Sequence, residues 1–465
     1  MKRSEAFVGK MLAKFQNPFF QILLLFIITR FILALQLGDC TAFAPDELSY
    51  LKILILTDKP NLVTSDLPWA ELPRFARILI FLPALLLHKF GISYLLAFRF
   101  QTIFYSAIAV FSFYMVVRSI VNHVNSGKNL SLETNKNSKI YLALIVFMPT
   151  TIIWSSLGLR EPLLYLTSGV IALAFSRLSE DGDNKFSLKW LSILFIGLEI
   201  LAVTKLYLFL IVIFSLLVAL LISKSMSSKV KSFIVIPIFL ATLIQGSALQ
   251  QIFDVSFSSN LTLSTQPSNF KKLSISIESL RECQDRNQGG PLIKILGDLL
   301  IEKTQTDPNS NKTQTDPNSN KTQTGPNSNK TQTEVIPATD YELSKNRYQL
   351  NPVKIPMGLI SFLFFPIGGN VFGMFSIFGI LESIFWIPLY VILVREIRFS
   401  RKRQTEYSPL LIFLFLFIID FAIFSAATEV NFGTAIRHRS ILLLPIITST
   451  SILYLERKRG NTLAP

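Results

Sequence analysis

Apolar residues in this chain gather in long runs that are separated by short polar and basic segments. Such runs predict helices that cross a membrane, because about 20 apolar residues span the hydrocarbon of a bilayer. Several runs are shorter than this, so their helices must extend into flanking polar residues or thin the bilayer locally. Ten membrane-spanning helices are expected, at residues 19–37, 93–117, 140–154, 162–175, 190–203, 206–222, 233–248, 372–394, 409–426 and 440–455.

The division of residues 190–222 into two helices decides the predicted topology. A single helix of that length would be about 50 Å long, which is too long for one span. Thr204-Lys205 is the polar point at which it can break. With ten spans both termini lie in the cytoplasm, and every cytoplasmic segment is basic, as the positive-inside rule requires. These segments are the N-terminus and residues 118–139, 177–189, 224–231, 395–403 and 457–459.

This topology divides the chain into a transmembrane half at residues 1–248, an extracytoplasmic insertion at 249–370 and C-terminal transmembrane helices at 371–465. The first extracytoplasmic loop covers residues 38–92. Within it the short apolar stretch 76–90 is expected to lie on the outer surface as an interfacial helix. The insertion contains a tandem nonapeptide at 303–333, KTQTDPNSN and its variants. These repeats lack apolar positions, so they are expected to be disordered.

Composition supports an all-α polytopic membrane protein. Half of the 465 residues are hydrophobic, 40 are Phe, and only 16% are charged, against about 25% in soluble domains. The net charge of +15 is assigned to the cytoplasmic loops, and a nucleic-acid partner is not expected. The two cysteines, Cys40 and Cys283, exclude a cysteine-based metal cluster, and three scattered histidines argue against a His-rich site. Both cysteines fall on the extracytoplasmic side, where a disulfide can form.

Four polar motifs fall on the extracytoplasmic face in this topology: Asp46-Glu47, Arg160-Glu161, Thr204-Lys205 and Arg437-His438-Arg439. A carboxylate at a membrane surface can deprotonate a hydroxyl group when its surroundings raise its pKa. Several cations beside lipid headgroups can hold a phosphate or diphosphate. The four motifs together therefore indicate chemistry on a lipid-phosphate substrate.

Each motif also has a purely structural interpretation. Asp46-Glu47 can be a solvated pair in a loop, and Arg160-Glu161 can mark helix ends, where such charges are favourable. Lys205 can extend its ammonium group to the membrane surface, and the basic cluster before the last span can anchor that helix. The ionisable residues inside the spans are expected to pair within the bundle rather than to react. They are Arg30, Arg99, Glu199, Glu382 and Asp420.

The first half of the chain resembles the type C glycosyltransferase superfamily, which includes the protein mannosyltransferase and lipid A aminoarabinose transferase families. The similarity lies in ITRFILAL followed by PDELSY, in LPALLLHKFGISYLLAFRF, in FMPTTIIWSSLGLREPLLYL and in IGLEILAVTKLYLFL. The segment RHRSILLLP is similar only in a general way. The 249–370 insertion and the position of Arg160-Glu161 depart from the family pattern.

This resemblance implies a multi-pass enzyme of the plasma (inner) membrane with an extracytoplasmic active site. The enzyme would transfer a sugar from a polyprenyl-phosphate donor to a glycan, lipid or protein acceptor, with membrane lipids around it. Asp46 would be the general base, and Glu47 and Glu161 would position the acceptor or a divalent metal, although no cofactor is certain. Lys205, Arg437 and Arg439, together with Arg160 and His438, would bind the donor phosphate.

Three other functions are compatible with the sequence. A polysaccharide polymerase or ligase of lipid-linked glycans would need outer-face arginines equally but would not require Asp46. A transporter should show related halves and helices that are broken at the midplane, and no such internal repeat is present. A structural or assembly protein would tolerate the loss of all four motifs.

Overall fold

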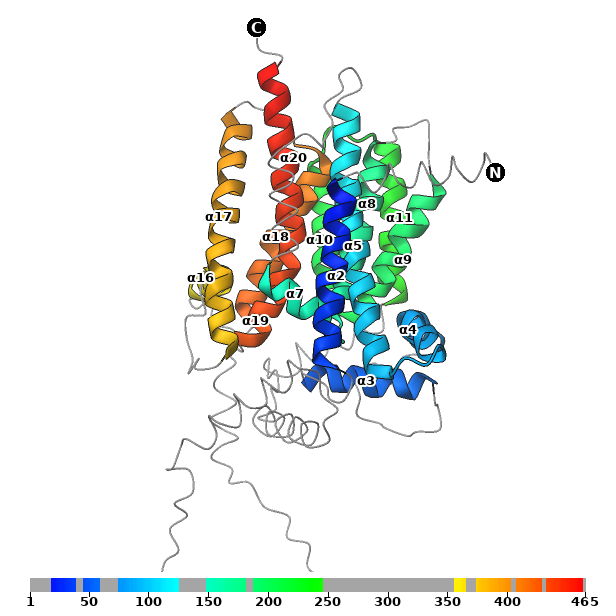
Figure 1. The fold of residues 1–465 in the computed structure, drawn as a ribbon. Coiled ribbons are helices and arrows are strands. Elements are labelled where there is room, and N and C mark those ends of the chain that lie inside the picture. The colour runs from blue at the N-terminus through cyan, green and yellow to red at the C-terminus, as the bar shows by residue number, and fades with distance from the viewer. Residues whose placement is uncertain are drawn as a thin grey trace, which may run out of the picture.

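The computed structural model describes residues 18–38, 45–58, 74–124, 148–180, 187–245, 355–364, 374–402, 407–428 and 432–462. Within these residues the chain is helical and contains no strand (Figure 1). The elements are α2 (Pro18–Leu37), α3 (Pro45–Asp58), α4 (Arg74–Lys89), α5 (Tyr94–Val124), α7 (Pro149–Ser156), α8 (Glu161–Glu180), α9 (Leu188–Thr204), α10 (Leu206–Ile222), α11 (Ser228–Ile244), α16 (Ile355–Phe364), α17 (Met374–Lys402), α18 (Pro409–Thr428), α19 (Phe432–Arg439), the 3-10 turn η4 (Ser440–Leu442) and α20 (Leu443–Thr462).

Five helical segments of the described chain are long and apolar enough to cross a membrane by themselves: Phe19–Leu37, Tyr94–Ile120, Glu161–Glu180, Pro409–Ala427 and Ile436–Arg457. This agrees with a polytopic membrane protein. The helices α9, α10 and α11 have 17 residues each and are therefore about 25 Å long, slightly less than the hydrocarbon thickness. Most of the expected span 140–154 lies outside the described residues. The full set of ten spans thus stays a prediction.

The predicted break at Thr204-Lys205 is present. Helix α9 ends at Thr204 and α10 begins at Leu206, with Lys205 between them at φ −159° and ψ 88°. The Thr204 hydroxyl donates a hydrogen bond of 2.7 Å to the Ile200 carbonyl, which satisfies this side chain inside its own helix. The two helices pack against each other, so the break forms a hairpin that places Lys205 at its tip.

Two short helices, α3 and α4, lie across one end of the bundle (Figure 1). The expected helix at 76–90 is confirmed as α4. Its residues Ile80, Phe81 and Ala84 are buried, whereas Leu79 and Leu86 on the opposite face are 65% and 48% exposed. The Gln101 side chain of α5 binds α4 through the Ala84 amide at 3.0 Å and the Ile80 carbonyl at 3.1 Å. This amphipathic helix suits a membrane interface.

The helix α3 corrects the expectation that Asp46-Glu47 lies in a loop. Helix formation begins at Pro45, so both acids belong to the first helical turn. Proline at the first position followed by acidic residues is a helix-start signal, because proline needs no amide partner there and the acids face the positive end of the helix dipole. The sequence therefore carried a signal for this element.

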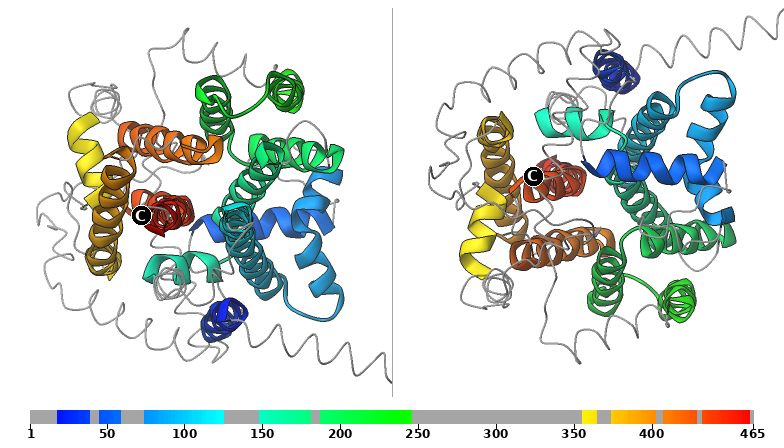
Figure 2. Two further views of the ribbon diagram at one scale, coloured as in Figure 1. Left: turned by 90° about the horizontal axis from the view of Figure 1, so that it is seen from above. Right: turned by 90° about the horizontal axis from the view of Figure 1, so that it is seen from below.

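The core of the bundle lies around α8 and α20. In the spanning windows of these two helices 72% and 83% of the residues are buried, against 22% in α2, which therefore lies at the periphery. Viewed along the bundle, α20 lies between α17 on one side and α5 on the other (Figure 2). The charged motifs at the start of α8 and before α20 are consequently held by the most buried helices.

The described part of the 249–370 insertion is α16, which belongs to the bundle because it packs closely on α18. At Gly358 a Cβ atom would lie 2.5 Å from the Ala426 carbonyl oxygen, so only glycine allows this approach. The nonapeptide repeats at 303–333, Cys40 and Cys283 lie outside the described residues.

Candidate active site

The turn between α7 and α8 places Arg160 and Glu161 at one end of the bundle. Leu157 and Leu159 in this turn are almost fully buried and fix its position. The Arg160 carbonyl accepts hydrogen bonds from the amides of Leu163 and Leu164, at 3.0 and 3.2 Å, which starts α8. Glu161 is therefore the first residue of a central helix, and its side chain is only 1% exposed.

Two guanidinium groups lie next to the Glu161 carboxylate. Arg437 Nε of α19 is 3.1 Å from Glu161 Oε1, and Arg160 Nε is 3.8 Å from the same atom. These contacts are ion pairs without hydrogen-bond geometry, and neither oxygen of Glu161 accepts a hydrogen bond from another described residue. A buried carboxylate usually accepts hydrogen bonds, so Glu161 has the capacity to accept one from a substrate hydroxyl.

Arg160 is charged in this environment. Burial by itself lowers the pKa of its guanidinium group, but the neighbouring Tyr50 of α3 and Glu161 raise that pKa above its usual value. Its side chain is 24% exposed, so it is the more accessible of the two residues in this motif. Arg160 thus provides a permanent positive charge between α3 and α8.

Lys205, at the tip of the α9–α10 hairpin, faces the same region. Its ammonium nitrogen is 2.6 Å from His438 Nε2 and 4.7 Å from the centre of the Tyr207 ring. Because an ammonium group can only donate, His438 must accept at Nε2 and is therefore neutral, with its proton on Nδ1. Lys205, Arg160 and Arg437 all interact electrostatically with Glu161.

Arg439 has a different set of partners. Its Nη2 is 3.5 Å from Glu382 Oε2 of α17, and its Nη1 is 3.4 Å from the Leu363 carbonyl of α16. The guanidinium carbon lies 5.4 Å from the Trp386 ring centre, and Trp386 donates a hydrogen bond of 2.7 Å to Glu382. The prediction that Arg439 shares one phosphate site with Arg437 thus has no support in these contacts, which bind Arg439 to α16 and α17.

Glu47 is buried and saturated with hydrogen bonds. Arg99 of α5 donates to both carboxylate oxygens, at 2.7 and 3.0 Å, and the Gly158 amide donates at 2.7 Å. A Cβ atom at Gly158 would lie 2.5 Å from the Phe98 ring and 3.2 Å from Glu47 Oε1. Glu47 therefore links α3 and α5 to the turn that carries Arg160 and Glu161. These contacts give it a structural role and do not support the expected role in acceptor binding.

Asp46, the expected general base, precedes Glu47 in the first turn of α3. Its side chain lies outside the described residues. The backbone places it four residues before Tyr50, whose side chain interacts with Arg160. The helix that carries Asp46 therefore borders the cluster around Glu161.

The ionisable residues within the spans have partners in the bundle, as expected. Arg99 and Glu382 form the ion pairs described above. Asp420 accepts a hydrogen bond of 3.0 Å from Ser215, and Glu199 accepts one of 3.0 Å from Gln245. Arg30 donates to the Ser155 hydroxyl at 3.0 Å and lies 3.5 Å from the centre of the Phe26 ring.

The described residues contain no group of three or more His, Cys, Asp and Glu side chains that could hold a metal ion. A divalent metal therefore stays a prediction that would need the side chain of Asp46 or other residues outside the described part. What the structure brings together is a carboxylate and three cations, Arg160, Lys205 and Arg437, from three separate elements. Such a set can bind an anionic group and stabilise charge that develops on it.

A scan against models of protein families found no match, and a search of curated proteins found none either.

Proposed function

We propose that this protein is a membrane glycosyltransferase that moves a sugar from a polyprenyl-phosphate donor to an acceptor hydroxyl on the extracytoplasmic side. The observation that carries the proposal is the cation cluster around Glu161. Arg160, Lys205 and Arg437 come from the α7–α8 turn, the α9–α10 break and α19. Three cations and one carboxylate leave a surplus of two positive charges, which suits a phosphate group that gains charge as it leaves.

The proposed reaction is a single displacement. Asp46 accepts the proton of the acceptor hydroxyl, and the acceptor oxygen forms a bond to the anomeric carbon of the sugar. The bond from that carbon to the phosphate oxygen breaks, and its electron pair stays on the phosphate, so the configuration at the anomeric carbon is inverted. Arg160, Lys205 and Arg437 stabilise the departing phosphate because its charge increases in the transition state.

Glu161 has two parts in this proposal. It holds Arg437 and Arg160 in place through its ion pairs, and its free hydrogen-bonding capacity is available to a sugar or acceptor hydroxyl. His438 positions the Lys205 ammonium group by accepting a hydrogen bond from it at Nε2. The acceptor is a glycan, a lipid or a protein.

Asp46→Asn tests the proposal. The amide is nearly isosteric with the carboxylate but cannot accept a proton, so sugar transfer should fall by about 10²–10⁴-fold while donor affinity is retained. The measurement is transfer from a purified polyprenyl-phosphate sugar by the full-length protein in detergent, alongside donor binding. Wild-type turnover in Asp46→Asn would refute the assigned base and favour a polymerase or ligase of lipid-linked glycans. Absence of donor binding in the wild-type protein would favour a transporter or an assembly protein.

A further inference from the structure

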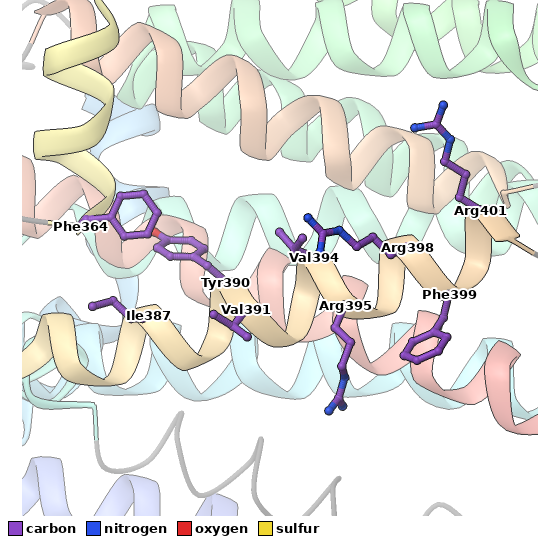
Figure 3. A pocket seen from close by; sticks show the side chains of 9 residues that line it. All are labelled: Phe364, Ile387, Tyr390, Val391, Val394, Arg395, Arg398, Phe399 and Arg401. Carbon is purple, nitrogen blue, oxygen red and sulfur yellow. The ribbon is translucent and has the colours of Figure 1, made fainter.

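A groove of about 890 Å³ runs along α17, lined by Phe364 of α16 and eight residues of α17 (Figure 3). Its apolar wall includes Ile387, Val391 and Val394, which are 40%, 60% and 46% exposed. Trp386, Leu389 and Leu393 lie on the buried side of the same helix. The groove is therefore on the outer face of α17, where hydrocarbon chains can enter it.

The groove is basic at one end. Residues 387, 391, 394, 398 and 401 follow each other at steps of four, three, four and three, so they form one stripe along α17. The first three are apolar and the last two are Arg398 and Arg401. An apolar stripe that ends in cations matches a lipid with an anionic headgroup.

Two neighbouring arginines, Arg395 and Arg457, share one acidic partner. Glu396 is buried, and its Oε1 lies 3.0 Å from Arg395 and 3.2 Å from Arg457. Within the described residues, Arg398 and Arg401 form no salt bridge or hydrogen bond. Arg398 and Arg401 project from one side of α17 and Arg395 from the other (Figure 3). Two exposed arginines at the end of the groove are thus available to a ligand.

We propose that this groove binds an anionic phospholipid, with its acyl chains along Ile387, Val391 and Val394 and its phosphate between Arg398 and Arg401. The site is distinct from the candidate active site. Glu382, which contacts Arg439, precedes Arg398 and Arg401 by 16 and 19 residues, which is about 24–28 Å along a helix. This distance is close to the hydrocarbon thickness of about 30 Å, so the two phosphates lie in opposite leaflets.

The test uses the full-length protein in phosphatidylcholine nanodiscs, with and without phosphatidylglycerol. Native mass spectrometry counts the retained phosphatidylglycerol, and a titration gives its affinity. Each arginine contributes about fivefold to the attraction of an anionic lipid, so Arg398→Gln combined with Arg401→Gln should weaken phosphatidylglycerol binding by about 25-fold. Lys224→Gln combined with Lys229→Gln is the matched control, because both lysines are exposed and outside the groove.

A third variant tests the apolar wall. Val391→Trp fills the groove without a change of charge and should also displace the bound phosphatidylglycerol. Equal binding of phosphatidylcholine and phosphatidylglycerol would overturn the proposal, and so would an equal loss in the lysine control. Tighter binding of a polyprenyl phosphate than of phosphatidylglycerol, lost on removal of Arg398 and Arg401, would assign the groove to the donor instead. Donor affinity at the candidate active site is measured separately. Failure of the proposed transferase function can therefore be distinguished from failure of the phospholipid site.

Discussion

Arg437, His438 and Arg439 are consecutive, yet each contacts a different part of the molecule. The reason is the rotation of about 100° per residue in a helix, since these residues end α19. Arg437 reaches Glu161 at the start of α8, His438 reaches Lys205 at the α9–α10 break, and Arg439 reaches Glu382 in α17. A basic run that resembles one binding patch in the sequence is therefore a junction between three helices.

The separate partners of the two arginines predict different outcomes for the same substitution. Arg437→Gln should lower both donor affinity and turnover but leave the fold intact, because Arg160 still compensates Glu161. Arg439→Gln should mainly reduce stability, because it removes the Arg439 side of the ion pair with Glu382, which is buried next to Trp386. Loss of one partner of a buried ion pair costs about 3–5 kcal/mol. Thermal unfolding in detergent and transfer assays on both purified proteins would measure the difference.

Arg395→Gln is the control for both variants. Arg395 is 53% exposed, and Arg457 remains 3.2 Å from Glu396 when it is removed, so neither stability nor transfer should change much. If Arg437→Gln and Arg439→Gln proved indistinguishable in both measurements, the assignment of the two arginines to different roles would be wrong.

At the scale of single elements, the turn before α8 is fixed by the Arg99–Glu47–Gly158 contacts. The buried Arg99–Glu47 pair connects α3 and α5. The Gly158 amide donates a hydrogen bond to Glu47 and so attaches the turn to this pair. Because a Cβ atom at position 158 would lie only 2.5 Å from the Phe98 ring, the turn depends on glycine for its position. The position of this turn therefore sets the orientation of Arg160 and Glu161.

Gly158→Ala should therefore move the turn and reduce both stability and sugar transfer, with a stability cost of about 1–3 kcal/mol. Gly169→Ala provides the comparison within α8, since its Cβ would meet the Phe113 ring at 3.2 Å, away from the turn. That variant should lose stability only. Thermal unfolding and transfer rates would separate the two, and full transfer activity in Gly158→Ala would show that the turn tolerates the displacement.

The sequence allowed some of these elements to be predicted and not others. The break was predictable because a helix of about 50 Å exceeds one span and Thr204-Lys205 is the polar point within residues 190–222. The helix α3 differs from the predicted loop: Pro45 and the two acids mark a helix start, but its 14 residues are too few and too polar to form a spanning run. The Glu47–Arg99 pair joins residues 52 positions apart, and a single sequence carries no signal for such a contact.

For the whole molecule, the ends of the helices separate into two groups. Ser119 near the end of α5 donates to Glu180 at the end of α8, and Lys231 at the start of α11 donates to the Ser223 carbonyl after α10. These ends lie at the end of the bundle opposite α19 and α3 (Figure 1). The candidate active site and these helix ends thus occupy opposite ends of the bundle, and the side of the membrane that each end faces stays a prediction.

Reporters fused at positions along the chain would test this sidedness. Fusions near Asn122, Gly182 and Lys229 should report the cytoplasm, because the positive-inside rule keeps these basic segments there. A fusion near Asn309 should report the extracytoplasmic side. The measurement is a paired phosphatase and fluorescent-protein assay at each position. A cytoplasmic signal at Asn309 would contradict the ten-span topology and place the cation cluster at the wrong surface for the proposed reaction.

The helices α19 and α20 are joined without a break through η4. The number of residues in this segment therefore matters as well as their identity. Leu442, Leu443 and Ile446 are fully buried and fix the rotation of α20 in the core. One residue inserted between Arg439 and Leu443 would rotate all three preceding side chains by about 100° relative to that core. No single substitution could restore the contacts with α8, α9–α10 and α17 together. Among related chains, insertions and deletions should therefore be rarer here than changes of residue type.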